Sequence, residues 1–510
     1  MAIQGYKFFI RPVTDPESEW VAVNNVPQDN PDYTFIDLVS DTEYEISATA
    51  VDYAGNESEM ATPLSVTTLA HNPEDDPMSD IDASAIDAIV ASERTAGLGH
   101  ALNAGCQVYV TGPKGFYRKA FGTAYGRALT LDDKMRFGSI TKCATATLIL
   151  AQIDAGHLSF EDTIDQFVDG IVNGDKITIR MLLMMRSGIK DYLQQDQAIQ
   201  INYMLHPTQV FDPLPTIRSY PALHAPDAVT DYSNSNYFLL GKVLENLDAT
   251  YGSGRTAREI LNEDFCQAVG MTESEWPTGT LMQAPYARGW TDNPAWAQMV
   301  ATVNSLPLAW LFGAIYWALV PSLSGGWPAV PNFEFTAADT GWANAAGAIG
   351  GTITDLVRFG EALRDGELIS PEMKQLREEE FRTYIAYVPV SPEQGDGWSG
   401  SGLGVMKFQE WYGWIGNFCG YMAIVFYNPT NNAIIAIQGN YFGFPVLNMF
   451  YRIRYALWPE SCITPPFTQR MLTEMTSDAD EFGTGTLWTW HALGDADGTD
   501  VLPHKVPFYL

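Results

Sequence analysis

The sequence predicts an α+β fold: an antiparallel sheet flanked by helices, with a helical subdomain, preceded by a small β-sandwich-like module. Three observations support this prediction. Short alternating strands fill the first 70 residues. The larger part of the chain opens with a helix and strands and closes with strands and a final helix. A segment that starts near residue 140 is mostly apolar or small, so its helix is expected to be buried.

Residues 1 to 70 are predicted to form strands at 6–11, 20–23, 33–38, 43–52 and 64–68. The run from Thr42 to Ser58 alternates inward and outward residues and ends in a Gly-Asn turn. It resembles the F strand and F–G turn of a fibronectin type III module, with Tyr44 as the corner tyrosine. The first two strands of such a module are missing. Either the module is a minimal variant, or a neighbouring chain covers its open edge.

A polar, proline-bearing linker is expected at residues 71–82, followed by the main domain at 83–463. Its helices are predicted at 81–95 and 446–458, and its strands at 107–111, 115–122, between 402 and 427, and at 433–438. An insertion at 291–346 is rich in Trp and Leu and is interpreted as a core-packing helix or as a lid beside the site. Residues 464–510 form a C-terminal extension that we expect to dock on this chain or on a neighbour.

Composition excludes several classes of function. The net charge of −32 argues against sequence-independent binding to nucleic acid or anionic membrane, since either needs clustered Lys and Arg. Five scattered cysteines lack C-x-x-C spacing, and seven histidines lack an H-E-x-x-H pattern, so neither a metal site nor a cofactor is predicted. The longest apolar run, residues 306–320, is too short to span a membrane, and the first 20 residues lack a Sec signal peptide.

Ser139 and Lys142 carry the strongest chemical signal. They lie three residues apart at a helix start, so both side chains share a face and the amine can reach the hydroxyl. A serine hydroxyl becomes a good nucleophile when a nearby base takes its proton, and burial lowers the pKa of a lysine enough for that role. The pair therefore predicts a nucleophile and its base.

Two further motifs follow in order along the chain. Tyr232 and Asn234 form a Tyr-x-Asn triplet just before an apolar helix. The run from Gly413 to Asn417 opens a strand-like segment that ends near residue 427. With the Ser-x-x-Lys motif, these elements resemble the serine β-lactamase and penicillin-binding-protein superfamily, in its branch of class C β-lactamases, D-alanyl-D-alanine carboxypeptidases and esterases. The likeness covers most of residues 83 to 460.

That resemblance implies specific roles. Ser139 would be acylated, Lys142 and Tyr232 would manage its proton, and Asn234 would position the substrate amide. The oxyanion hole would use the main-chain N–H groups of Ser139 and of Asn417, the residue after the third motif.

The third motif departs from the family pattern. Relatives that act on carboxylates usually carry Lys-Thr-Gly or His-Thr-Gly, whereas this chain has Trp414, Ile415 and Gly416. A tryptophan offers substrate an apolar face and one N–H donor instead of a cation, so ester or uncharged-amide hydrolysis is favoured. Arg186 or another cation is an alternative source of the anion contact.

Two interpretations of function follow. The first is a serine hydrolase that attacks an ester or amide of the bacterial cell envelope. Its domain combination resembles minor tail proteins of phages that infect actinobacteria, which predicts a virion protein made in the host cytoplasm, with other tail proteins or further copies of this chain as partners. The second is a catalytically inactive structural or receptor-binding tail protein. A D-alanyl-D-alanine carboxypeptidase or a bacterial esterase is a further alternative.

Overall fold

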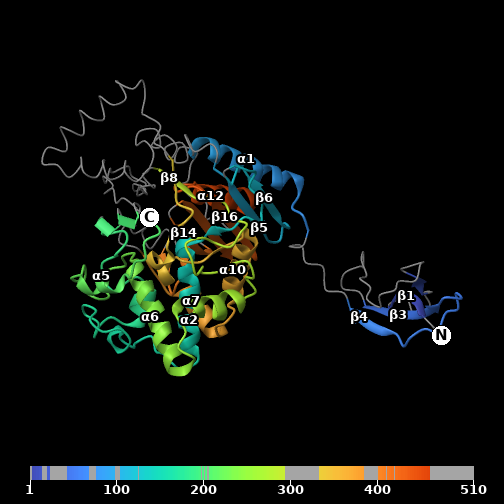
Figure 1. The fold of residues 1–510 in the computed structure, drawn as a ribbon, viewed down its shortest axis with the longest axis horizontal. Coiled ribbons are helices and arrows are strands. Elements are labelled where there is room, and N and C mark those ends of the chain that lie inside the picture. The colour runs from blue at the N-terminus through green and yellow to red at the C-terminus, as the bar shows by residue number, and fades with distance from the viewer. Residues whose placement is uncertain are drawn as a thin grey trace, which may run out of the picture. The chain divides into compact units, whose positions relative to one another are not determined.

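A computed structural model describes most of the chain: residues 3–13, 20–22, 43–67, 76–97, 104–292, 332–383 and 400–459, apart from 125, 197, 200–201, 204–205, 409 and 419. The chain divides into two compact units, Met1–Pro77 and Met78–Leu510 (Figure 1). The predicted strand at 33–38, the middle of the predicted insertion at 293–331 and the C-terminal extension lie outside the described residues.

The described part of the first unit is a four-stranded antiparallel sheet in the order β2-β1-β3-β4. The strands are β1 (Ile3–Pro12), β2 (Val21–Ala22), β3 (Glu43–Asp52) and β4 (Leu64–Thr67). Strand β3 alternates buried and partly exposed residues, as expected for a strand with one covered face. The fibronectin type III resemblance stays a prediction, because a second sheet is not among the described residues.

The second unit is built on an eight-stranded antiparallel sheet in the order β11-β12-β13-β14-β15-β16-β5-β6. Its strands are β5 (Cys106–Thr111), β6 (Tyr117–Phe121), β11 (Phe381–Thr383), β12 (Gly400–Gly402), β13 (Met406–Phe408), β14 (Trp411–Phe418), β15 (Tyr421–Asn428) and β16 (Ala433–Gly439). The N-terminal pair β5 and β6 joins the sheet beside β16, so the two ends of the domain meet in one sheet.

Helices cover both faces of this sheet. Helices α1 (Asp80–Gly97) and α12 (Val446–Leu457) pack together on one face, and α10 (Ile353–Asp365) packs on the other (Figure 1). Every residue of β15 and β16 is buried, which explains why these strands read as continuous apolar runs rather than alternating ones. Helix α10 begins at a Thr352 cap and ends at Gly366, whose positive φ closes the helix.

The helical subdomain is centred on α2 (Thr141–Asp154) and α6 (Asn234–Tyr251), which pack against each other. The first ten residues of α2 are all buried, as its apolar sequence predicts. Around this pair lie α3 (Ile179–Leu183), α5 (Leu214–Ser219), α7 (Ala257–Ile260), a π-helical segment (Leu261–Gln267) and α11 (Pro371–Glu379). The predicted α+β fold, an antiparallel sheet flanked by helices with a helical subdomain, is confirmed.

Short elements connect the sheet to this subdomain. Strands β7 (Met135–Arg136) and β10 (Gly350–Gly351) form a two-stranded sheet. A second pair, β8 (Trp290–Asp292) and β9 (Asn332–Glu334), joins the two sides of the predicted insertion. Two 3₁₀ turns, Gly138–Ile140 and Asn344–Ala346, lie next to α2 and α6. These turns and helix starts carry the candidate site.

Candidate active site

Ser139 and Lys142 meet as their spacing predicts. Ser139 lies in the 3₁₀ turn that precedes α2, and Lys142 is the second residue of that helix. The Lys142 amine lies 2.9 Å from the Ser139 Oγ. The serine is 6% exposed and the lysine is fully buried, so the hydroxyl lies at the rim of the site and the amine behind it.

Lys142 has a complete set of partners. Besides Ser139, its Nζ donates to the Asn234 Oδ1 at 2.8 Å and to the Ala346 carbonyl at 2.7 Å. Burial lowers the pKa of Lys142 from its ordinary 10.5 to about 7, and the Asp191 carboxylate opposes this effect. A neutral amine has two N–H bonds and one lone pair. If the two N–H bonds go to Asn234 and Ala346, the lone pair is left for the Ser139 proton.

Tyr232 and Asn234 come from the start of α6, far along the chain from Ser139. The Tyr232 hydroxyl lies 2.7 Å from the Ser139 Oγ and 3.3 Å from the Asn234 Oδ1. The Lys142 Nζ also lies 5.0 Å from the centre of the Tyr232 ring. Ser139 therefore has two groups within hydrogen-bond reach that can exchange a proton with it, an amine and a phenol.

Asp191 joins this group although the sequence interpretation did not include it. It is fully buried and accepts hydrogen bonds from the main-chain N and the side-chain Nδ2 of Asn234, both at 2.9 Å. Burial raises the pKa of its carboxyl, and N–H donors from Asn234, Gln194 and Leu193 oppose the rise. None of the three sequence motifs includes Asp191, which lies three residues after Gly188.

Strand β14 brings the third motif against the serine. A Cβ on Gly416 would lie 1.7 Å from the Phe137 carbonyl oxygen, and a Cβ on Gly138 would lie 2.6 Å from the Asn417 nitrogen. Gly138 also has φ +56°, which favours glycine. The two glycines thus allow the main chain of β14 at Asn417 to lie against the turn that carries Ser139.

The predicted contact between substrate and the indole of Trp414 needs correction. Trp414 is 1% exposed, and its ring packs 6.5 Å from the ring of Tyr237. Alternation along β14 points the Trp414 side chain toward the core, where it packs among buried residues such as Tyr237. The neighbouring Ile415 is apolar and only partly buried, and it packs against the core cluster that α1 and α12 contribute to. Arg186 is bonded to Asp227 and Thr230, so its charge is already paired.

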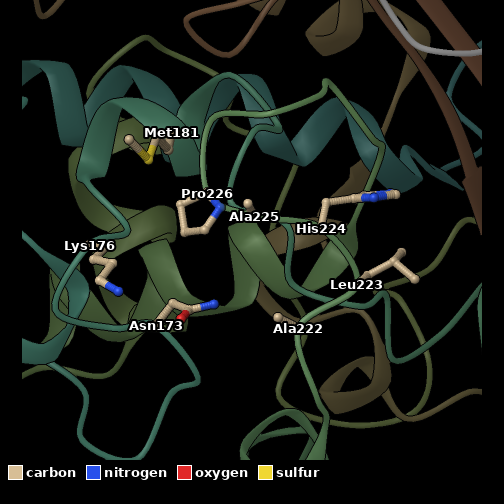
Figure 2. Close-up of a pocket in the computed structure, with 8 residues that line it drawn as sticks. All are labelled: Asn173, Lys176, Met181, Ala222, Leu223, His224, Ala225 and Pro226. Carbon is tan, nitrogen blue, oxygen red and sulfur yellow. The ribbon is translucent and has the colours of Figure 1, made fainter.

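A surface hollow of about 620 Å³ lies elsewhere, between the 173–181 region and residues 222–226 (Figure 2). Its lining residues are Asn173, Lys176, Met181, Ala222, Leu223, His224, Ala225 and Pro226. None of the candidate catalytic side chains lines it. One link to the site is His224, whose Nε2 lies 3.4 Å from the carboxylate of Asp231, the residue before Tyr232. The chemistry therefore rests on the Ser139 cluster and not on this hollow.

Within the described ranges, no group of three or more His, Cys, Asp or Glu side chains is placed to bind a metal ion. The helices described by the structure are all too short or too polar to cross a membrane. Cys106, Cys143 and Cys266 are buried free thiols, and burial raises the pKa of each to about 12. At neutral pH these three are therefore protonated and act as small apolar side chains.

The cluster places a buried amine and a phenol within hydrogen-bond reach of a serine hydroxyl, which is the set of groups that acyl transfer through a serine needs. The family described as Beta-lactamase matches residues 83–457, and the chain belongs to this family. The match begins in α1 and ends at the last residue of α12, so it covers the whole sheet and both of its helical faces.

Individual relatives are distant. The chain is 26% identical over 137 residues to a Bacillus subtilis (strain 168) protein named as a penicillin-binding protein, PbpX, covering 27% of this chain and 31% of that protein. It is 26% identical over 184 residues to penicillin-binding protein 4 of Amycolatopsis lactamdurans, covering 34% and 45%. The chain thus spans less than half the length of either relative. A D-stereospecific amidohydrolase from Streptomyces sp. shares the fold, with 22% identity, a TM-score of 0.55, and coverage of 72% and 99%.

Proposed function

We propose that the protein hydrolyses an ester or an uncharged amide of the bacterial cell envelope through an acyl-enzyme at Ser139. Lys142, as the neutral amine, takes the Ser139 proton while the Oγ forms a bond to the substrate carbonyl carbon. The main-chain N–H groups of Ser139 and Asn417 receive the developing oxyanion. The proton then passes through Tyr232 to the leaving oxygen or nitrogen as its bond to carbon breaks.

Deacylation reverses the proton path. A water molecule passes one proton through Tyr232 to Lys142 as its oxygen bonds to the acyl carbon. Lys142 then returns that proton to the Ser139 Oγ as the bond between the Oγ and the acyl carbon breaks. Asn234 contributes through its Oδ1, which accepts from Lys142, and so holds the amine toward the serine. The cycle uses water, the side chains of this cluster and the two main-chain N–H groups that receive the oxyanion.

One observation carries this proposal: the buried Lys142 amine contacts Ser139 while its other two bonds are fixed by Asn234 and Ala346. A lysine retained for packing alone would gain nothing from burial among so few charges, because desolvation of an ammonium is costly. The same arrangement explains why the pKa of Lys142 falls to about 7, where a general base is most effective. It also disfavours the inactive alternative.

The substrate class follows from strand β14. The motif that carries a cation in carboxylate-binding relatives is here a buried Trp414 and an apolar Ile415, while Arg186 is paired with Asp227. None of these three described side chains offers a free cation, so an isolated carboxylate would lose its hydration without a charged partner from them. Esters and uncharged amides avoid that cost. The fold it shares with an amidohydrolase named as D-stereospecific supports D-configured amides as one class to assay.

We extend the proposal to a virion tail role, with the first unit as an assembly module. Support comes from the compact unit that precedes the catalytic domain and from its four-stranded sheet, in which β2 and β4 are the outer strands among the described residues. Edge strands can pair with another chain. Light scattering of the full chain, alone and mixed with other tail proteins, tests this role. A chain that stays a monomer and joins no tail assembly would contradict it.

Covalent labelling tests the hydrolase proposal directly. A fluorophosphonate should add one equivalent of mass to the wild type and none to Ser139→Ala. Ser233→Ala is the matched control, because its Oγ is buried next to the site and makes no hydrogen bond. It should label like wild type. The mechanism would be overturned if the wild-type chain took up no label. It would also be overturned if the Ser139→Ala variant were labelled. A β-lactam tested in parallel reports whether carboxylate-bearing substrates are accepted.

A further inference from the structure

Asp191 is a buried carboxylate whose hydrogen bonds all come from N–H donors. One oxygen accepts from the main-chain N and the Nδ2 of Asn234, both at 2.9 Å. The other accepts from the main-chain N–H groups of Leu193 at 2.6 Å and Gln194 at 3.0 Å. Each of these four bonds needs an oxygen lone pair, and a carboxylate supplies four. The geometry therefore fits the ionised form.

The bond to the Asn234 side chain decides which way that amide faces. Because Nδ2 donates to Asp191, the amide oxygen must point the other way, and it accepts from Lys142 at 2.8 Å. A flipped amide would place its NH₂ group against the lysine amine, donor against donor, and would leave an oxygen against a carboxylate. Asp191 thus excludes the amide orientation that would displace Lys142 from Ser139.

The charges around this chain of contacts are few. The groups that act on Lys142 are Asp191 and the Cys143 thiol, together with the rings of Tyr232 and Tyr237. Those that act on Asp191 are Lys142 and the N–H donors described above. The carboxylate in turn acts on the phenols of Tyr192 and Tyr220. The Cys143 thiol is protonated at neutral pH and carries no charge. Asp191, on the other side of the Asn234 amide, is therefore the charged group that acts on Lys142.

We propose that Asp191 is a positioning residue of the hydrolytic site, which fixes the Asn234 amide and holds a negative charge behind Lys142. The inference rests on the proposed function, since it assigns Asp191 a part in activating the same serine. Its consequence is electrostatic as well as geometric. The carboxylate favours the ammonium form of Lys142, which burial disfavours, so the two effects together set the pH at which the free base appears.

Asp191→Asn separates these effects from simple packing. The substitution keeps the side-chain volume and removes the negative charge. It also replaces one carboxylate oxygen by an NH₂ group, which would face the N–H donors that now bind Asp191. We expect kcat/KM on a p-nitrophenyl ester to fall about 10- to 100-fold, as for other misplaced catalytic groups. The rising limb of its pH profile should move to lower pH by about one unit or more, because an opposite charge has been removed from Lys142.

Asp133→Asn is the matched control. Asp133 is also fully buried and accepts from Thr130 and Arg127, but it makes no contact with the cluster. Loss of the Asp133 charge should lower the melting temperature of the protein without moving the midpoint of its pH–activity profile. Asp191→Glu, which keeps the charge, should lower the rate while keeping the midpoint. If Asp191→Asn fails to fold, Asp191→Ser removes the charge and retains an oxygen for the Asn234 amide.

The outcomes separate the two proposals. If the wild type is labelled but the pH midpoint of activity is unshifted in Asp191→Asn, the role of Asp191 is overturned and the serine mechanism stands. A midpoint that shifts to higher pH would overturn it too, since the sign follows from the charge. A wild type that takes up no fluorophosphonate would overturn both. A shift to lower pH in Asp191→Asn, absent in Asp133→Asn, supports the inference.

Discussion

Replacing Gly416 by alanine tests how closely strand β14 must approach the turn that carries Ser139. The added Cβ would lie 1.7 Å from the Phe137 carbonyl oxygen and 2.8 Å from its carbon. Both atoms are backbone, so no side chain can rotate away. Ordinary contact begins at 3.4 Å, so strand and turn must separate by about 1.7 Å. That displacement would carry the Asn417 N–H away from Ser139.

The expected cost falls mainly on catalysis. Loss of one oxyanion donor lowers kcat by about 10²- to 10³-fold, and a misplacement of about 1 Å costs about 10²-fold. Overpacking of a core typically lowers the free energy of unfolding by about 1–3 kcal/mol, which leaves most domains folded. Gly416→Ala should therefore be a folded enzyme with a kcat reduced by about two to three orders of magnitude.

Hydrolysis of a p-nitrophenyl ester measures kcat, and urea unfolding followed by circular dichroism measures stability. Gly279→Ala is the control, because a Cβ at that glycine meets no atom within 4 Å. It should match the wild type in both assays. A Gly416→Ala enzyme with wild-type activity would refute the inferred approach of β14 to the nucleophile. A variant that loses stability and activity in parallel would show that the contact is structural only.

Four further predictions follow from the site. Ser139→Ala should lower turnover by several orders of magnitude, measured by ester hydrolysis, since it removes the atom that we propose is acylated. In the wild type, kcat/KM should rise as pH increases through about 7, because the free base of Lys142 is the active form; a flat profile between pH 6 and 8 would contradict this role. A p-nitrophenyl ester should be cleaved much faster than a cephalosporin, given apolar Ile415 and buried Trp414, and a faster cephalosporin would reveal another anion contact. Deleting residues 1–75 should leave hydrolysis intact, since the cluster lies wholly in the second unit; a loss of kcat would show that the first unit contributes to the site.

Local sequence pattern was enough to predict part of the site. Ser139 and Lys142 lie within one turn, so their contact follows from helix geometry alone. The burial of helix α2 was predicted for a similar reason, because a helix whose residues are mostly apolar or small on every side must be covered. The resemblance of ordered motifs then placed Tyr232 and Asn234 in the same site. The structure brings all four residues together.

Asp191 and Trp414 show where sequence reasoning ended. A single carboxylate in a loop has no periodic pattern, and its importance arises from four N–H donors that only the folded chain assembles around it. Trp414 stands where relatives carry a cation, which suggested a substrate contact. Its indole is covered instead by residues distant in sequence, including Tyr237.

The sequence by itself determined the fold class, the contact between Ser139 and Lys142, and the absence of a cation in the third motif. These depend on residue type and on spacings of a few residues, which fix local geometry. The tertiary structure alone decided which way the Asn234 amide faces, how deeply Trp414 is buried, and how far burial lowers the pKa of Lys142. Each of these depends on desolvation and on hydrogen bonds between segments far apart in the chain, and such contacts exist only once the chain has folded.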